Sequence, residues 1–530
     1  MAAMMLVFLI AFEVAFAIYA VRRRANGKRW MHTRVIASTV ELAIALVMAL
    51  ASQGALQGAF GLRFGALVAV MVVRIVMELV IYLVKRSKPV SGQPVRTSRP
   101  VRSALRSILL MALALIPAFL FTGYQGLPTT GQHEVAETSA ILVDQSRTDP
   151  FESDGSAREI PLHFYYPADA VTQDDAAGTG AASSPTDATP SSESGGAAET
   201  YPMVVFSHGA FGFYRSNYST YMELASHGYV VVALDYPHHA FVTEDTDGRT
   251  VLADSTFLQT AVAAENNELS PEETFAVTHD WLDLRCVDLN FVLDTLKHTQ
   301  AEGSFDESAW WFASAADESD VRTALSEADM NHIGLAGHSL GGATSVELGR
   351  TRSDIGAVID IDGTMFGSEL ALADEAQTSD AQTASSVTAD STADSNQADN
   401  SASGNDTTGD SQVFDTTPFP VPLLSIDNEH HYLIGIQEGD GYVNNVVLDN
   451  ATTATHTYFV GSGHLNFTDL PLFSPTLASL LGTGDVQPQA CVEQMNAVVL
   501  QFFDYYLKGE GEVGSIAECY DPSSLGSDRE

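Results

Sequence analysis

The sequence predicts an α/β fold with a mainly parallel central sheet and helices on both of its faces, preceded by an all-α segment of four transmembrane helices. After residue 200, short runs rich in valine and isoleucine alternate with helix-like segments, which is the order of βαβ units. Several of these runs are apolar throughout, as expected for strands buried on both faces of a parallel sheet. The first 124 residues are mostly apolar, which predicts the membrane segment.

Four apolar stretches open the chain, and each is long enough to cross a bilayer as a helix. They cover residues 4–21, 35–53, 64–84 and 107–124. The loop between the second and third stretches contains one basic residue, whereas the segments after the first and third are rich in lysine and arginine. The positive-inside rule therefore places these two basic segments in the cytoplasm and the N-terminus outside.

This orientation predicts two domains. Residues 1–124 are expected to form a four-span anchor in the cell membrane, and residues 125–530 an extracytoplasmic α/β domain. A cleaved signal peptide is the alternative for the first stretch, but its positive charges follow the apolar run instead of preceding it.

Ionisable residues interrupt the apolar stretches at four positions: Glu13, Glu41, Arg74 and Glu78. An ionised side chain at the centre of a membrane helix costs about 2.5 to 3.5 kcal/mol on insertion scales, so we expect these groups to face one another instead of lipid. Arg74 and Glu78 are spaced to pair on one helix face. Ion pairs that hold the helices together are the favoured interpretation, and a transport or sensing site is the alternative.

Charge is distributed unevenly along the chain. The net charge is −41, yet the first 123 residues contain more than half of the 26 lysines and arginines. The remainder is therefore strongly acidic, which disfavours a nucleic-acid partner and the capture of anionic lipid by charge. Two stretches with few large apolar residues, about 168–200 and 371–412, predict disordered acidic insertions in the second domain.

The elements of the second domain follow from runs of β-branched residues and from helical periodicity. We predict strands over 202–206, 229–234, 332–336, 355–361, 421–426 and 453–460, and helices over 218–226, 275–296, 340–351 and 491–507. Two earlier runs, 136–143 and 160–166, predict an antiparallel edge. The segment 241–280 predicts either a lid with an interfacial surface or a packed loop.

Three cysteines are too few for a disulfide framework. Cys491 and Cys519 can pair in an oxidising exterior, and Cys286 is expected to be buried and free. No group of histidine, cysteine and carboxylate residues has the spacing of metal ligands. We therefore predict neither a metal nor another cofactor.

A nucleophile motif follows the predicted strand 332–336. Residues 337–341 read Gly-His-Ser-Leu-Gly, and the next residues are small and lead into the predicted helix. A strand, a turn of the form Gly-x-Ser-x-Gly and a helix make a nucleophile elbow, in which small neighbours permit the strained backbone of the serine. The motif alone is common by chance, but this placement predicts Ser339 as the nucleophile of an α/β-hydrolase.

A catalytic serine needs a histidine base and a carboxylate that orients the histidine, and in this fold both follow the serine. His464 lies in a glycine-rich loop after the last predicted strand and is the predicted base. Asp362, at the end of strand 355–361, is the predicted acid, and Asp360 is the alternative. Three other histidines are expected to be structural or to line the pocket: His430, His431 and His456.

The tetrahedral intermediate of ester hydrolysis requires backbone N–H donors to its oxyanion. One is expected from Leu340, which follows the nucleophile. The other lies in the loop after strand 202–206, and Ala210 is the predicted residue. His208, two residues earlier, is expected to brace this loop by a hydrogen bond.

Motifs spread over residues 200–507 resemble the platelet-activating factor acetylhydrolase family, in its lipase-like type II branch. The resemblance is carried by the elbow and by the segments 205–209, 215–219, 224–228, 362–366, 426–429 and 461–469. By these motifs Ser339, Asp362 and His464 resemble the nucleophile, the acid and the base of the family. Ala210 and Leu340 resemble its oxyanion donors.

The resemblance implies a serine ester hydrolase that acts on short or oxidised acyl esters of phospholipids without calcium. The chain departs from the family pattern at Ala210, where a bulkier residue is usual, and at Thr364, where an aromatic residue is usual. One alternative is a carboxylesterase, polyester or cell-envelope esterase of the dienelactone-hydrolase type. Another, outside the enzymes, is an inactive membrane sensor. The predicted ligand is a lipid or a small ester.

Overall fold

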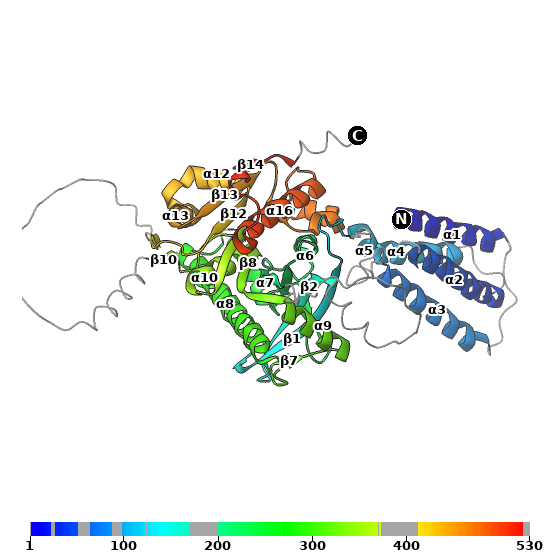
Figure 1. The fold of residues 1–530 in the computed structure, drawn as a ribbon. Helices are drawn as coiled ribbons and strands as arrows, with labels where there is room; N and C mark the ends of the chain where they lie inside the picture. Colours follow the sequence, from blue (N-terminus) through cyan, green and yellow to red (C-terminus); the bar gives the residue numbers. More distant parts are fainter. Residues whose placement is uncertain are drawn as a thin grey trace, which may run out of the picture. The chain divides into compact units, whose positions relative to one another are not determined.

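The computed structural model describes residues 2–22, 27–50, 64–86, 98–121, 126–168, 200–266, 268–368, 370–372 and 412–522. The chain forms two compact units (Figure 1). One consists of Met1–Pro128 together with Leu470–Thr483, and the other of Thr129–Asp469 together with Gly484–Glu530. Most of the two predicted insertions, 168–200 and 371–412, lies outside the described residues.

The first unit is helical. It contains α1 (Ala2–Arg22), α2 (Gly27–Leu50), α3 (Gly65–Arg86), α4 (Ser98–Ala114), α5 (Ile116–Leu120), α14 (Leu470–Phe473) and α15 (Pro475–Leu480). Within the described ranges, three segments are long and apolar enough to cross a membrane: Ala2–Arg22, Trp30–Val47 and Gly65–Val84. The predicted fourth span, 107–124, is divided between α4 and α5, because Pro117 near the start of α5 has no N–H to continue the helical ladder.

Buried ion pairs join α1, α2 and α3. Arg34 donates hydrogen bonds to both carboxylate oxygens of Glu13, at 2.6 and 2.7 Å, and to Glu78 at 3.0 Å. Arg74 donates to Glu13 at 3.0 Å and to Glu41 at 2.5 Å, and its Nε lies 3.7 Å from Glu78. The prediction that the charged residues of the apolar stretches face one another is confirmed. Arg34 lies outside the predicted span 35–53 and joins them because α2 begins earlier, at Gly27.

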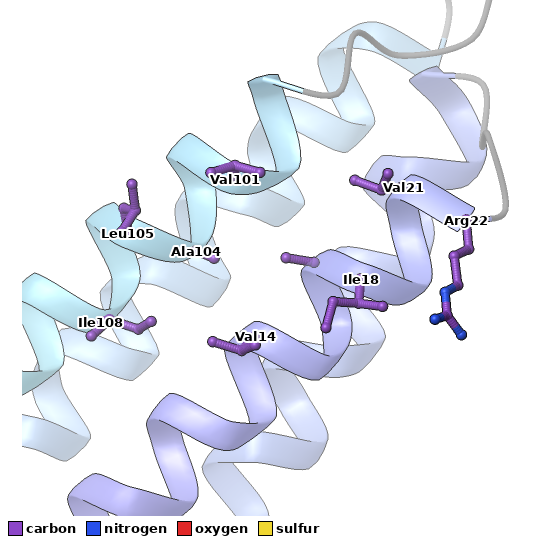
Figure 2. A pocket seen from close by; sticks show the side chains of 9 residues that line it. Val14, Ile18, Val21, Arg22, Val101, Ala104, Leu105 and Ile108 are labelled. Atoms are coloured by element: carbon purple, nitrogen blue, oxygen red, sulfur yellow. The ribbon is translucent and has the colours of Figure 1, made fainter.

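A groove of about 380 Å³ lies between α1 and α4 (Figure 2). Its lining is aliphatic except for one arginine and consists of Val14, Ala17, Ile18, Val21, Arg22, Val101, Ala104, Leu105 and Ile108. No acid, general base or nucleophile belongs to this lining. The groove is therefore not a site of ester chemistry.

The second unit is built on a ten-stranded sheet of order β14-β13-β12-β9-β8-β3-β4-β2-β1-β7. All pairs from β14 to β4 are parallel, whereas β2, β1 and β7 add antiparallel pairs at one edge. This is an α/β-hydrolase fold, and the predicted antiparallel edge is confirmed. The strands are β1 (Val135–Thr148), β2 (Ala157–Pro167), β3 (Tyr201–Ser207), β4 (Val230–Leu234), β7 (Trp310–Trp311), β8 (Ala328–His338), β9 (Ile355–Ile361), β12 (Leu423–Asn428), β13 (Ala454–Phe459) and β14 (Cys519–Tyr520).

Helices cover the sheet, so that every residue of β3, β4 and β12 is buried. α8 contacts α9 and α10, and α6 contacts α16. Aliphatic residues of the central strands and of α8 form the main core. The helices are α6 (Tyr218–Ser226), α7 (Ser255–Glu265), α8 (Pro271–Glu302), α9 (Ala315–Glu327), α10 (Leu340–Thr351), α12 (Glu429–Glu438), α13 (Val443–Asn450) and α16 (Pro488–Phe503).

Helix α8 is longer than the predicted 275–296 because capping residues determine both of its ends. Ser270 and Glu273 form a reciprocal capping box at its start, and Gly303 ends it with a φ of 66°. The preceding segment contains α7 and a hairpin of β5 (Val242–Glu244) and β6 (Thr250–Leu252).

None of the three cysteines forms a disulfide, and the possible pair between Cys491 and Cys519 is not formed. Cys491 is buried in the core on α16, whereas Cys519 lies exposed on the edge strand β14. Cys286 is buried and forms no disulfide, as expected.

Candidate active site

Ser339 stands in the turn between β8 and α10, with a φ of 57° in the left-handed region. The turn is very close-packed. A Cβ on Gly337 would lie 2.1 Å from the carbonyl oxygen of Gly341, and a Cβ on Gly341 would lie 2.0 Å from that of Ser207. Only glycine fits at these two positions, so the approach of strand and helix requires the motif. The predicted nucleophile thus lies at the carboxyl end of a parallel strand, where sites form in open α/β sheets.

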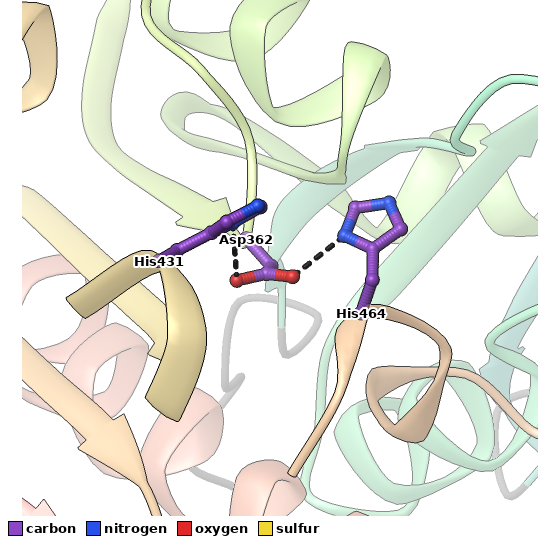
Figure 3. A group of neighbouring side chains, drawn as sticks. All are labelled: Asp362, His431 and His464. Atoms are coloured by element: carbon purple, nitrogen blue, oxygen red, sulfur yellow. Dashed lines mark hydrogen bonds and ion pairs between the residues drawn. The ribbon is translucent and has the colours of Figure 1, made fainter. Parts of the chain in front are cut away.

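Asp362 follows β9 and also has a positive φ, of 58°. Its Oδ2 accepts a hydrogen bond from Nδ1 of His464 at 2.6 Å (Figure 3). Asn428 donates two more, from its backbone N at 2.7 Å and from Nδ2 at 2.6 Å. Burial opposes the charged form, but the hydrogen bonds from His431 and His464 hold the pKa of Asp362 well below its ordinary value. The carboxyl group is therefore ionised at neutral pH.

Asp360, the alternative acid, lies on β9 beneath the elbow. Its Oδ1 accepts a hydrogen bond from the N–H of Gly363 at 3.1 Å, and a Cβ on Gly342 would lie 1.8 Å from this oxygen. Burial raises the pKa of Asp360 well above its ordinary value, and the charges of Asp427 and Asp362 add to the effect. Within the described part of the chain it bonds to no histidine. The geometry therefore favours Asp362 as the partner of His464.

Asp362 has a second imidazole partner, which was predicted only as a structural or pocket-lining residue. Nδ1 of His431 lies 3.0 Å from Oδ1, opposite His464 (Figure 3). Asn428 positions this ring, because it caps α12 and its side chain accepts the N–H of His431 at 2.9 Å. An asparagine at the end of a strand, with histidines in the following helical turn, is the signal that could have predicted this contact.

The same three side chains are the described residues that could hold a metal ion. One ligand atom from each of Asp362, His431 and His464 lies within 4.8 Å of the other two. In the structure both imidazoles use Nδ1 for the carboxylate instead. This arrangement suits hydrogen bonding around an ionised carboxylate.

The two predicted oxyanion donors lie on segments that meet at the elbow. A Cβ on Gly209 would lie 3.1 Å from Cβ of Ser339, so the loop of Ala210 packs directly against the nucleophile turn. Leu340 is the first residue of α10, where N–H groups have no intrahelical acceptor. Among the residues that the structure describes, neither Ala210 nor Leu340 donates its N–H to an acceptor. Both N–H groups are therefore candidates for the oxyanion site.

Ser339 makes no hydrogen bond to His464 within the described ranges. His338, the residue before Ser339, holds the loop of His464 to the elbow. Its Nε2 donates a hydrogen bond to the carbonyl oxygen of His464 at 3.0 Å. Burial lowers the pKa of His338 to about 3, so this ring is neutral. A bond between serine and histidine is often long in the free enzyme and tightens when substrate binds.

A family model described as platelet-activating factor acetylhydrolase, isoform II, matches residues 172–515. The chain belongs to this family. Over 160 residues it is 26% identical to a platelet-activating factor acetylhydrolase of Cavia porcellus, a match that spans 28% of this chain and about a third of that protein, 32%. A ferulic acid esterase from Streptomyces cinnamoneus is a similar solved structure, with a TM-score of 0.47 and 20% identity over 75% of this chain and 96% of the esterase.

Family membership confirms the resemblance inferred from the motifs. The matched range includes Ala210, Ser339, Leu340, Asp362 and His464, whereas α1 to α5 lie before it. The chain is therefore an α/β-hydrolase of an ester-hydrolase family with additional apolar helices at its N-terminal side.

Aromatic side chains adjoin the loop of Ala210 in this family member. The ring of Phe211 lies 4.7 Å from that of Phe257 on α7. Phe257 in turn stacks on His239 at 4.1 Å and meets the edge of Trp281 at 4.9 Å. The segment 241–280 is thus packed at Phe257, although four of its apolar residues are exposed: Phe241, Leu252, Leu258 and Val262.

Proposed function

We propose that this chain is a serine ester hydrolase that works through an acyl-enzyme on Ser339. The observation that carries the proposal is the 2.6 Å hydrogen bond between Asp362 and His464, at the carboxyl ends of the central strands, where the nucleophile elbow lies. A carboxylate that holds Nδ1 of an imidazole leaves Nε2 available as a base. The family to which the chain belongs supports the same reaction.

In the proposed reaction, Oγ of Ser339 attacks the ester carbonyl carbon while Nε2 of His464 takes the hydroxyl proton. The oxyanion accepts hydrogen bonds from the N–H groups of Ala210 and Leu340, and loss of one such donor typically lowers kcat by about 10²- to 10³-fold. His464, stabilised as a cation by Asp362, then protonates the departing alcohol. A water molecule activated by the same histidine hydrolyses the acyl-enzyme.

The proposed substrates are phospholipids with a short or oxidised acyl chain. The relative from Cavia porcellus is named for the acetylhydrolysis of platelet-activating factor, and the chain matches about a third of its length. The aromatic pair of Phe211 and Phe257 adjoins the proposed donor Ala210. Apolar surface there would favour binding of an acyl group, because each Å² of apolar surface that is buried contributes roughly 25 cal/mol.

We further propose that α1 to α4 anchor the enzyme in the cell membrane and that the hydrolase unit lies on its outer side. The three apolar segments support the anchor. The outer location also requires the predicted fourth stretch, 107–124, to cross the membrane, which the basic residues before it favour. A membrane anchor keeps the enzyme close to lipid substrates without any attraction by charge.

Replacement of the nucleophile tests the reaction. Ser339→Ala should abolish the hydrolysis of p-nitrophenyl acetate and labelling by a fluorophosphonate probe. Ser353→Ala removes an exposed hydroxyl shortly after α10 and should leave both unchanged. Retained labelling of Ser339→Ala would exclude Ser339 as the nucleophile, and absence of labelling in the unchanged protein would favour an inactive sensor.

A panel of esters tests the substrate class. The proposal expects the highest kcat/KM for phospholipids that carry a short sn-2 acyl chain, with lower values as that chain lengthens. Preference for simple, polymeric or cell-envelope esters over all phospholipids would instead identify an esterase of the dienelactone-hydrolase type.

A further inference from the structure

Arg285 is a fully buried cation on α8 that forms no ion pair with a carboxylate among the described residues. Asp288, one turn further along the helix, pairs instead with Arg147 and Arg158. An unpaired charge is costly to bury, and burial lowers the pKa of Arg285 to about 10. The guanidinium is still charged at neutral pH, so its contacts must compensate for the lost hydration.

The guanidinium contacts the loop that carries Ala210. Nη1 of Arg285 donates to the carbonyl oxygen of His208 at 2.5 Å, and Nη2 donates to that of Gly209 at 3.3 Å. The guanidinium carbon lies 4.4 Å from the ring centre of Tyr236, and Nε lies 3.4 Å from Nδ1 of His239. Two successive carbonyl groups of one loop thus take the place of a counterion.

The carbonyl of Gly209 and the N–H of Ala210 belong to the same planar peptide group. A cation at the carbonyl oxygen withdraws electron density through the conjugated amide and makes the N–H a stronger donor. The same contact fixes the plane of the peptide and therefore the direction of the N–H. Arg285 thus acts on the N–H of Ala210 through the carbonyl oxygen of the same peptide and has no contact with the substrate.

His208 reinforces this arrangement. The N–H of Tyr236 can only donate, and it lies 3.3 Å from Nε2 of His208, so the ring proton must be on Nδ1. Nδ1 therefore donates to the carbonyl oxygen of Gly209 at 2.7 Å, as the N–H of Gly212 does at 3.1 Å. Burial, together with the charge of Arg285, lowers the pKa of His208 to about 3 and keeps the ring neutral. Three donors thus converge on one carbonyl.

We propose that Arg285 is a positioning residue that orients and polarises the peptide of Gly209 and Ala210, so that the Ala210 N–H binds the oxyanion of the transition state. This inference rests on the proposed ester hydrolysis. It assigns a catalytic consequence to a side chain that is remote from the nucleophile in sequence and has no contact with the ester.

Kinetics of Arg285→Met and Arg285→Lys test the proposal. Each variant is titrated with the fluorophosphonate, so that kcat is expressed per reactive Ser339. Arg285→Met should lower kcat by about tenfold or more while KM changes by less than about twofold, because the lost interaction acts on the transition state. Affinity for a trifluoromethyl ketone, which forms an oxyanion on the serine, should fall in parallel with kcat/KM.

Arg158→Met is the matched control, because Arg158 is equally buried but bonds to Asp149, Asp288 and the carbonyl of Pro237. It should lower stability without changing kcat per labelled site. If Arg285→Met does not fold, Arg285→Lys decides alone, since one ammonium group cannot reproduce the fork of a guanidinium. A lowered kcat per labelled site supports the role, and an unchanged value overturns it. Failure of the unchanged protein to label would instead contradict the proposed function.

Discussion

Asp362 is the residue on which the geometry of the site depends. It accepts hydrogen bonds from Nδ1 of His464 at 2.6 Å and from Nδ1 of His431 at 3.0 Å, each on a different carboxylate oxygen. Burial disfavours the charged form of His431, but the bond to Asp362 outweighs it and raises the pKa of His431 above its ordinary value. The negative charges of Asp427 and Asp360 act in the same direction. A cationic His431 then competes with His464 for one carboxylate.

This competition predicts a pH effect for His431→Gln. Below its pKa, His431 carries a positive charge at a ring distance of 5.9 Å from His464 and disfavours protonation of the base. Glutamine removes that charge, so the repulsion that opposes a proton on His464 is lost and less of the base is neutral at acidic pH. The acid limb of the kcat/KM profile should move upward by roughly one pH unit.

Measurement of kcat/KM from pH 5 to 9 checks this prediction, with His430→Gln as the matched control. His430 is exposed and is the preceding residue on α12. An acid limb that stays in place, or moves to lower pH, in His431→Gln would show that His431 does not influence the base.

At the scale of elements, the junction of β3, β8 and α10 leaves no room for side chains at its glycines. Gly341→Ala would place a Cβ 2.0 Å from the carbonyl oxygen of Ser207. The variant should lose about 1 to 3 kcal/mol of unfolding free energy, the usual cost of an inserted methyl group, together with most of its esterase activity. Gly514→Ala meets nothing within 4 Å and serves as control. Chemical denaturation of both variants measures the difference, and equal stability would contradict the close approach.

The buried ion pairs of the helical unit lead to a second prediction at the scale of elements. Glu13 accepts hydrogen bonds from both Arg34 and Arg74, so Glu13→Ala leaves two buried cations short of a partner. The cost should be about 3 to 5 kcal/mol, as for other buried pairs that lose one member. Thermal loss of helicity in detergent should occur at a markedly lower temperature than for Arg102→Gln, which changes an exposed side chain of α4. Equal unfolding temperatures would show that the cluster does not stabilise the bundle.

At the scale of the whole molecule, the cysteines report on the proposed orientation. Cys519 is exposed, whereas Cys286 and Cys491 are buried. A membrane-impermeant maleimide added to intact cells should therefore label the chain at Cys519 if the hydrolase unit lies outside. Cys519→Ser should remove the label. Labelling that requires permeabilised cells would place the hydrolase unit in the cytoplasm.

Much of the fold was predictable because its signals are local. The strand 355–361 and the helices 218–226 and 340–351 were predicted at the bounds that the structure has, since β-branched runs and small turn residues determine them nearby. Ser339 was predicted from the elbow motif for the same reason. The fourth apolar stretch was less predictable, because Pro117 divides it into two helices within one hydrophobic run.

By itself, then, the sequence determined the fold class, the family and two of the residues proposed for catalysis, Ser339 and His464, because motifs at strand ends encode them within a few positions. Tertiary structure decided what depends on groups distant in the chain. It distinguished Asp362 from Asp360 because His464 bonds to Asp362, and it brought His431 to the same carboxylate. It also placed Arg285 against the carbonyl oxygen of the peptide that carries the Ala210 N–H. Hydrogen bonds and burial at these positions arise only when separate elements pack together, so no local pattern records them.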